Sequence, residues 1–220
     1  MGYSVICISR DVGAGGEEIG RDVAEQLGYR YVDEEIIERA AEEAGIDPAD
    51  VASAEQRRGL AARLLDAIAQ SAVNMPEAMA WADQAGFEAH MPEGVRELIR
   101  EAVRQTADEG HAVIVAHAAS YVLTGREGVL RVFVTGSPEV CEARLVDAGA
   151  RDQAAAHREV SDGRNARADY LKRFHEVKQE LPTHYDLVLN TDQLGLEEAV
   201  SAVLAVARPA EARTIKHRSP

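Results

Sequence analysis

The stretch SRDVGAGGEEIG, residues 9–20, decides the fold because its glycines join a buried apolar run to a helical pattern. The run before it, residues 3–8, is rich in β-branched residues and predicts a fully buried strand of a parallel sheet. After the glycines, apolar side chains recur at helical spacing over residues 17–27, and Gly28 supplies a stop. Strand, glycine turn and helix in this order predict the first βα unit of an α/β domain.

The rest of the chain repeats this alternation. We expect further buried strands at residues 29–32, 112–116, 129–134 and 185–189, and helices at residues 138–146, 154–180 and 196–206. Strands that alternate with helices imply a parallel sheet. The prediction is one domain over residues 1–207, a three-layer α/β/α sandwich with a five-stranded parallel sheet and a helical insertion over about residues 46–110. The polar, basic tail at residues 208–220 has no periodicity, and we expect it to be disordered.

Charge and composition narrow the class of protein. The 220 residues carry a formal net charge of -14, and such an acidic surface repels a nucleic-acid backbone. One small phosphate site remains compatible with this charge, because it needs only a few cations and backbone N–H groups. No apolar run approaches the roughly 18 residues of a membrane helix, and the N-terminus lacks the pattern of a signal peptide. We therefore expect a cytoplasmic protein that binds neither nucleic acid nor membranes.

The glycine turn is the strongest candidate for a binding site. A helix N-terminus offers unpaired N–H groups and a partial positive charge, and glycines let the backbone curl around phosphate oxygens. The alternative is a flexible turn without a ligand. In the first interpretation the phosphate-binding residues are Gly13, Ala14, Gly15, Gly16, Glu17 and Glu18.

The turn departs from the strict phosphate-loop pattern G-x-x-x-x-G-K-[ST]. Aligned at the last glycine of that pattern, Arg10 replaces the first Gly, Gly16 replaces Lys, and Glu17 replaces Ser or Thr. The Lys normally bridges the β- and γ-phosphates, and the hydroxyl helps to hold magnesium. Arg10 could cover phosphate as a forked donor, whereas Glu17 or Glu18 could coordinate magnesium but would also repel the phosphates. The pattern predicts a catalytic role for Arg10 and leaves the metal ligands unassigned.

Residues 8–20 resemble the opening of the cytidylate kinase-like family, which runs roughly I-S-R-x-x-G-S-G-G-x-x-I-G and lacks the Lys. The resemblance continues through LGYRYVDEEII, residues 27–37, and HYDLVLNTDQLGLEEAV, residues 184–200. It implies a P-loop kinase fold and phosphate transfer from ATP to a nucleotide acceptor, CMP or dCMP, with Mg²⁺. The partners implied are small-molecule nucleotides.

The resemblance also implies two acceptor-binding positions. Asp33 corresponds to the Asp after the second strand of nucleoside monophosphate kinases, where an acceptor is oriented, although it could equally be a helix N-cap. His117 stands where relatives usually carry an acceptor-phosphate Arg, following Ala116 in place of Gly. Imidazole is only partly cationic near neutral pH, whereas guanidinium is a permanently charged fork. A structural histidine is the alternative for His117.

The segment HREVSDGRNARADYLKRFH, residues 157–175, is unusually basic for this chain. Arg164, Arg167 and Tyr170 recur at helical spacing on a common side. In the family, an Arg three residues before a Tyr belongs to the lid that closes over the triphosphate. The resemblance therefore implies a lid over about residues 150–180 and catalytic roles for Arg164 and Arg167, while a solvated charged helix is the alternative.

Two further hypotheses concern the whole chain. The changes at Gly16, Glu17, Ala116 and His117 would also suit a nucleotide-binding regulatory protein that keeps the scaffold without phosphoryl transfer. The apolar side chains of the helical insertion could pair with a second copy of the chain, which would give a homodimer.

Overall fold

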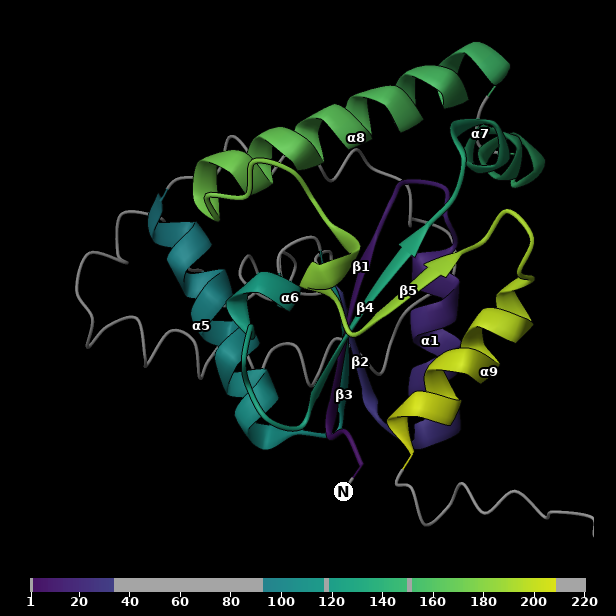
Figure 1. Cartoon of the computed structure of the whole chain (residues 1–220). Coiled ribbons are helices and arrows are strands. Elements are labelled where there is room, and N and C mark those ends of the chain that lie inside the picture. Colours follow the sequence, from purple (N-terminus) through teal and green to yellow (C-terminus); the bar gives the residue numbers. More distant parts are fainter. Residues whose placement is uncertain (1, 34–92, 117–118, 150–151, 209–220) are drawn as a thin grey trace, which may run out of the picture.

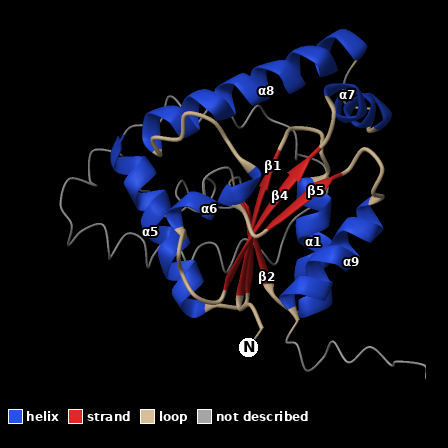
Figure 2. Cartoon of the chain, in the orientation of Figure 1, coloured by secondary structure: helices blue, strands red, loops and turns tan. Residues whose placement is uncertain are grey.

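The computed structural model of the chain describes residues 2–33, 93–116, 119–149 and 152–208. The strands are β1 (Val5–Arg10), β2 (Arg30–Asp33), β3 (Ala112–Val115), β4 (Val129–Thr135) and β5 (Leu187–Asn190). They form one sheet in the order β2-β3-β1-β4-β5, and all four neighbouring pairs are parallel. Figure 2 shows the strands between two groups of helices. The predicted three-layer sandwich with a five-stranded parallel sheet is confirmed.

Helices cover both faces of the sheet. One face carries α1 (Gly16–Leu27) and α9 (Leu196–Ala207), and the other carries α5 (Glu93–Glu109) and α6 (Ala119–Val122) (Figure 1). The side chains of β1 alternate between the two cores, with Ile6 and Ile8 against α1 and α9, and Val5 and Cys7 against α5. A strand covered on both faces needs apolar side chains at successive positions, which explains the unbroken apolar run in the sequence.

Two more helices lie at the carboxyl edge of the sheet. They are α7 (Pro138–Asp147) and α8 (Gln153–Phe174), and α8 runs across the carboxyl ends of the strands (Figure 1). The Asp152 side chain caps α8 by accepting a hydrogen bond from the Ala155 amide at 2.7 Å. Gly163 lets α8 approach the loop after β1, because a Cβ there would lie 2.6 Å from Cγ2 of Val12.

The end of α8 corrects one sequence prediction. The helical pattern predicted a helix over residues 154–180, but α8 ends at Phe174. Glu176 has a φ of 58°, in the left-handed region, so the chain turns there and leads back under the helix to a short 3₁₀ helix, Pro182–His184.

Several predictions lie outside the described residues. These are most of the insertion, residues 46–92, together with His117 and the tail from residue 209. Helix α5 is the described part of the insertion, and the division into domain, insertion, lid and tail stays a prediction. Within the described ranges, no helix is both long enough and apolar enough to cross a membrane.

Candidate phosphate-binding site

The glycine loop, residues 11–15, joins β1 to α1 at the carboxyl edge of the sheet. Gly13 and Gly15 have φ values of 76° and 84°, a region that side chains disfavour. Space is also limiting, because a Cβ on Gly13 would lie 2.6 Å from the carbonyl oxygen of Cys141, and one on Gly15 would lie 2.5 Å from Cδ2 of Leu196. The backbone therefore favours glycine at both positions, and at Gly13 the Cys141 backbone also leaves no room for a Cβ.

Two side chains hold the carbonyl groups of this loop. Arg144 on α7 donates to the Gly13 carbonyl at 3.2 Å, and the Thr191 hydroxyl donates to the Ala14 carbonyl at 3.0 Å. Arg144 also donates to the hydroxyl and carbonyl oxygens of Thr191, at 2.9 and 2.6 Å. Because C=O and N–H of a trans peptide point in opposite directions, the Gly15 amide faces away from Thr191. Together with the first amides of α1, which have no carbonyl one turn earlier in the helix, it can face an anion.

Arg10 fills the space where the strict phosphate loop carries its lysine. Its side chain is buried and lies against Gly16, where a Cβ would be 2.6 Å from Cβ and 2.9 Å from Cδ of Arg10. The Nε of Arg10 donates to the carboxylate of Glu17. A lysine at position 16 would collide with this arginine stem, which gives a physical reason for the glycine. The structure thus pairs Arg10 with the residue that replaces the usual hydroxyl.

The first turn of α1 carries two carboxyl groups. Glu17 is 21% exposed and paired with Arg10. Burial raises the pKa of Glu18, the charge of Glu17 adds to this, and Arg21 and Arg144 oppose it. Among the described residues, no group of three or more His, Cys, Asp or Glu side chains is placed to hold a metal ion. A magnesium ion here would take most of its ligands from phosphate and water, as is common for this metal.

Asp33 lies at the same edge of the sheet as the glycine loop. It ends β2 in register with Val115 of β3, and its side chain is buried. Tyr31, two residues earlier on the same face, stacks under the guanidinium of Arg21, with 5.3 Å between the ring centre and Cζ. This location suits an acceptor-side residue, although the role of Asp33 stays a prediction. The second predicted acceptor residue, His117, lies outside the part of the chain that the structure describes.

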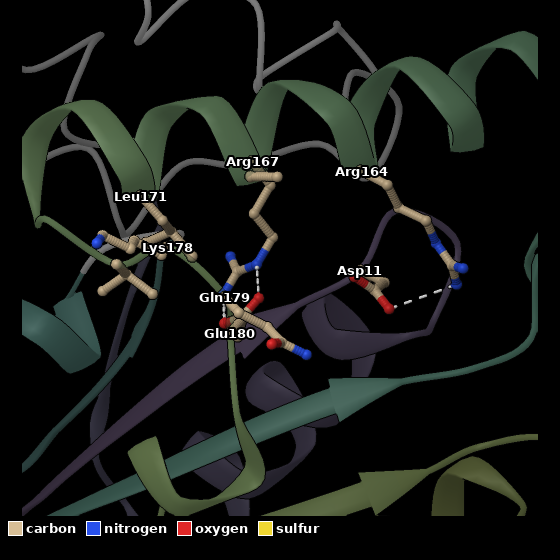
Figure 3. A pocket seen from close by; sticks show the side chains of 9 residues that line it. Asp11, Arg164, Arg167, Leu171, Lys178, Gln179 and Glu180 are labelled. Atoms are coloured by element: carbon tan, nitrogen blue, oxygen red, sulfur yellow. Dashed lines mark hydrogen bonds and ion pairs between the residues drawn. The ribbon is translucent and has the colours of Figure 1, made fainter.

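Helix α8 places Arg164 beside the glycine loop. Its guanidinium donates to the Gly136 carbonyl at 2.5 Å and lies 3.4 Å from the carboxylate of Asp11 (Figure 3). The Asp11 carboxylate also accepts a hydrogen bond from the Thr135 hydroxyl at 2.6 Å. Arg164 is 32% exposed, so it is anchored at the loop and still accessible to a ligand.

Arg167 lies on the same side of α8 but is buried, with 4% of its side chain exposed. It donates to both carboxylate oxygens of Glu180, at 2.8 and 2.5 Å, and to the Tyr185 hydroxyl at 2.9 Å. Its Cζ lies 5.3 Å from the centre of the Phe133 ring, which stacks on Tyr185. Tyr121 completes this group, which we call the Arg167 cluster, by donating to Glu180 at 3.3 Å.

The charges in the Arg167 cluster stabilise one another. Burial by itself would raise the pKa of Glu180, but hydrogen bonds from Arg167, Tyr185 and Tyr121 outweigh it and hold that pKa below its ordinary value. The pair is therefore ionised at neutral pH. The structure places Arg167 where it fixes α8 to the sheet, and its predicted role at a triphosphate stays a prediction.

A pocket of about 200 Å³ lies between the glycine loop on one side and α8 with the segment after it on the other. It is lined by Asp11, Arg164, Arg167, Ala168, Leu171, Val177, Lys178, Gln179 and Glu180 (Figure 3). Its volume is below the roughly 300–1,000 Å³ of typical small-molecule sites. The pocket therefore fits a part of a nucleotide, with charged groups of both signs on its wall.

Sequence reasoning missed four residues that shape this site: Asp11, Arg144, Glu180 and Thr191. Asp11 and Thr191 lie inside stretches that resemble the cytidylate kinase-like family, residues 8–20 and 184–200, and this resemblance was the one available signal. Arg144 contacts a carbonyl 131 residues earlier in the chain, and no local pattern marks such a partner.

His175, just after α8, makes stability depend on pH. It packs against Tyr121 and Tyr170, and burial, helped by the charge of Arg100, lowers its pKa to about 4. An unfolded histidine titrates near 6.5, so the unfolded chain binds more protons between these values and stability should fall as pH falls from about 6.5 towards 4. Allowing for partial exposure, the stability lost between pH 7 and pH 5 should be about 1 kcal/mol smaller in His175→Phe than in the parent, as measured by urea unfolding.

The exposed His157 provides the control for this measurement. His157→Gln removes a histidine near the start of α8 whose Nδ1 lies 2.8 Å from the Glu142 carboxylate, and it should not reproduce the effect of His175→Phe. Equal pH dependence in the parent and His175→Phe would show that His175 is not the titrating group.

Comparison with known proteins shows the family of this chain. The sequence profile of the cytidylate kinase-like family matches residues 5–193. The chain belongs to this family. A cytidylate kinase of Paramagnetospirillum magneticum (strain ATCC 700264 / AMB-1) is 30% identical over 213 residues, which cover 92% of this chain and 97% of that protein. The resemblance predicted from residues 8–20 is thereby confirmed, and the chain has the family and fold of a nucleotide kinase.

Solved structures agree on the fold. An uncharacterised protein from Eubacterium ventriosum ATCC 27560 superposes with a TM-score of 0.60 at 16% identity, covering 91% of this chain and 95% of that one. A shikimate kinase from Acinetobacter baumannii, solved in complex with shikimate, gives 0.51 at 14% identity, covering 96% and 95%. At these identities the structures support the kinase-type α/β fold alone.

Proposed function

We propose that this protein transfers a phosphoryl group from ATP to a nucleoside monophosphate, CMP or dCMP, with Mg²⁺ bound to the transferred phosphates. The observation that carries the proposal is the glycine loop held from behind by Arg144 and Thr191, with Arg10 in the space of the usual lysine. Phosphoryl transfer depends on positioning and on stabilising negative charge, and needs no protein nucleophile. The site supplies amides and arginines for both tasks.

Each group has a role in this proposal. The amides of Gly15 and of the first turn of α1 bind the phosphates of ATP, and Arg10 supplies the permanent charge of the missing lysine. Arg164 approaches from α8, and Arg167 adds charge at the pocket wall. Asp33 and His117 orient the acceptor. The cytoplasmic location, the homodimer through the insertion and the absence of nucleic-acid binding stay predictions.

A nucleotide-binding regulatory protein without phosphoryl transfer is the second candidate. The observation that favours it is the ion pair between Arg10 and Glu17, because catalysis would need the positive charge of Arg10 at the phosphates. His117 in place of an acceptor arginine points the same way. The two candidates differ in whether any monophosphate is converted.

A coupled assay that follows ADP formation with ATP, Mg²⁺ and a panel of monophosphates tests the proposal. We expect weak conversion of CMP and dCMP by the parent. His117→Arg should lower the acceptor KM by about 10- to 100-fold, because a charge-assisted hydrogen bond contributes roughly 1.5–3 kcal/mol.

His111→Arg is the matched control, since His111 precedes β3 at the opposite edge of the sheet. It should leave the acceptor KM unchanged. If neither the parent nor His117→Arg converts any monophosphate while ATP still binds by calorimetry, the regulatory function replaces the kinase function.

A further inference from the structure

The ion pair between Arg10 and Glu17 lies where a bound triphosphate needs positive charge. Both residues belong to the ends of elements that meet at the glycine loop, Arg10 to β1 and Glu17 to the first turn of α1. The Arg10 side chain is 4% exposed, and its Nε is directed at the Glu17 carboxylate. In this arrangement, Glu17 competes with any bound phosphate for the Arg10 guanidinium.

We propose that Glu17 pairs with Arg10 in the nucleotide-free protein and so keeps Arg10 from contacting phosphate. When magnesium-ATP binds, the Glu17 carboxylate moves from Arg10 to the magnesium ion. This inference rests on the proposed use of ATP. In the exchange, the carboxylate becomes a magnesium ligand and the guanidinium of Arg10 turns to the phosphates. One protein carboxylate with phosphate and water oxygens is a common magnesium shell.

Charge explains why the exchange needs the metal. ATP without a metal is strongly anionic, and it would meet Glu17 and Glu18 side by side at the start of α1. Taking Arg10 would leave the Glu17 carboxylate partly buried and without its cation, which is unfavourable. Magnesium reduces the repulsion between the phosphates and the two glutamates, because it neutralises phosphate charge. It also gives the Glu17 carboxylate a new positive partner.

Glu17 and Glu18 differ in a way that makes them a matched pair. Glu17 contacts Arg10 and is partly exposed, so its carboxylate can move towards a metal. Burial raises the pKa of Glu18, and the side chains whose charges act on it are Glu17, Arg21 and Arg144. Neutralising either residue removes one negative charge from the same helical turn. Only neutralising Glu17 also removes the ion pair between Glu17 and Arg10.

Calorimetric titration of the full chain with ATP, in EDTA and in excess magnesium, tests the proposal on the parent, Glu17→Gln and Glu18→Gln. The parent should bind ATP about tenfold or more tightly with magnesium than in EDTA. In EDTA, Glu17→Gln should tighten ATP binding by about tenfold relative to the parent, and clearly more than Glu18→Gln does, because the Glu17 carboxylate no longer competes with phosphate for Arg10. In magnesium, Glu17→Gln should bind ATP no more tightly than the parent.

Other outcomes would overturn the inference. If Glu17→Gln and Glu18→Gln gain ATP affinity equally in EDTA, the gain comes from the loss of one negative charge and not from Arg10. If the parent binds ATP equally in both buffers, magnesium has no role in the exchange. If Glu17→Gln does not fold, Glu17→Asp keeps the charge but withdraws the carboxylate from Arg10, and it should also tighten ATP binding in EDTA. Folded variants that bind no ATP in either buffer would overturn the proposed function itself.

Discussion

Replacing Arg10 by methionine should weaken binding of magnesium-ATP by about 10- to 100-fold, because each charge-assisted hydrogen bond contributes roughly 1.5–3 kcal/mol. Methionine fills much of the same space along Gly16 but carries no charge. Isothermal titration calorimetry with magnesium-ATP measures the change.

Two variants separate the charge of Arg10 from its shape. Arg10→Lys should retain part of the affinity, since lysine keeps the charge but loses the planar fork. Arg30→Met removes an arginine that pairs with Glu109 at the opposite edge of the sheet, and should leave ATP affinity unchanged. Unchanged affinity in a folded Arg10→Met protein would rule out Arg10 as the replacement for lysine.

The layered fold could be predicted because its elements leave local signals. β1 and β4 are mainly apolar and the buried residues of α1 recur at helical spacing, so these three elements are predicted correctly to within two residues at each end. Helices that alternate with strands then require a parallel sheet. The strand order β2-β3-β1-β4-β5 has no comparable local signal, since it depends on which strands pair across long crossovers.

The candidate site could be predicted only in part, because its contacts are not local. The glycines and Arg10 are adjacent in sequence and were identified. The helical pattern places Glu180 at the end of a helix, whereas the turn at Glu176 leads the chain back, so that Glu180 meets Arg167. The position of Arg10 over Gly16 likewise follows from the direction of a side chain at the end of β1, which no spacing rule gives.

The Arg167 cluster should carry a large share of the stability of this domain. Arg167→Met should lower the free energy of unfolding by about 3 kcal/mol, at the lower end of the range for breaking a buried ion pair, because 20% of the Glu180 side chain is exposed. For a domain of this size the midpoint of thermal unfolding should fall by roughly 6–12 °C. The pKa of Glu180 lies below its ordinary value, so this contribution is complete above about pH 4.3 and is lost as pH falls further, through the pKa of Glu180 in the folded protein.

A double-mutant cycle tests whether the two charges stabilise each other. Arg167→Met and Glu180→Gln should each be strongly destabilising, and the double variant should lose at least about 1 kcal/mol less than the sum of the two, because no charge is then left buried alone. Arg104→Met, which removes two exposed ion pairs on α5, should cost less than about 1 kcal/mol. Additive effects of Arg167→Met and Glu180→Gln in urea unfolding would contradict the ion pair, and Arg167 would then act through its other contacts, among them Phe133 and Tyr185.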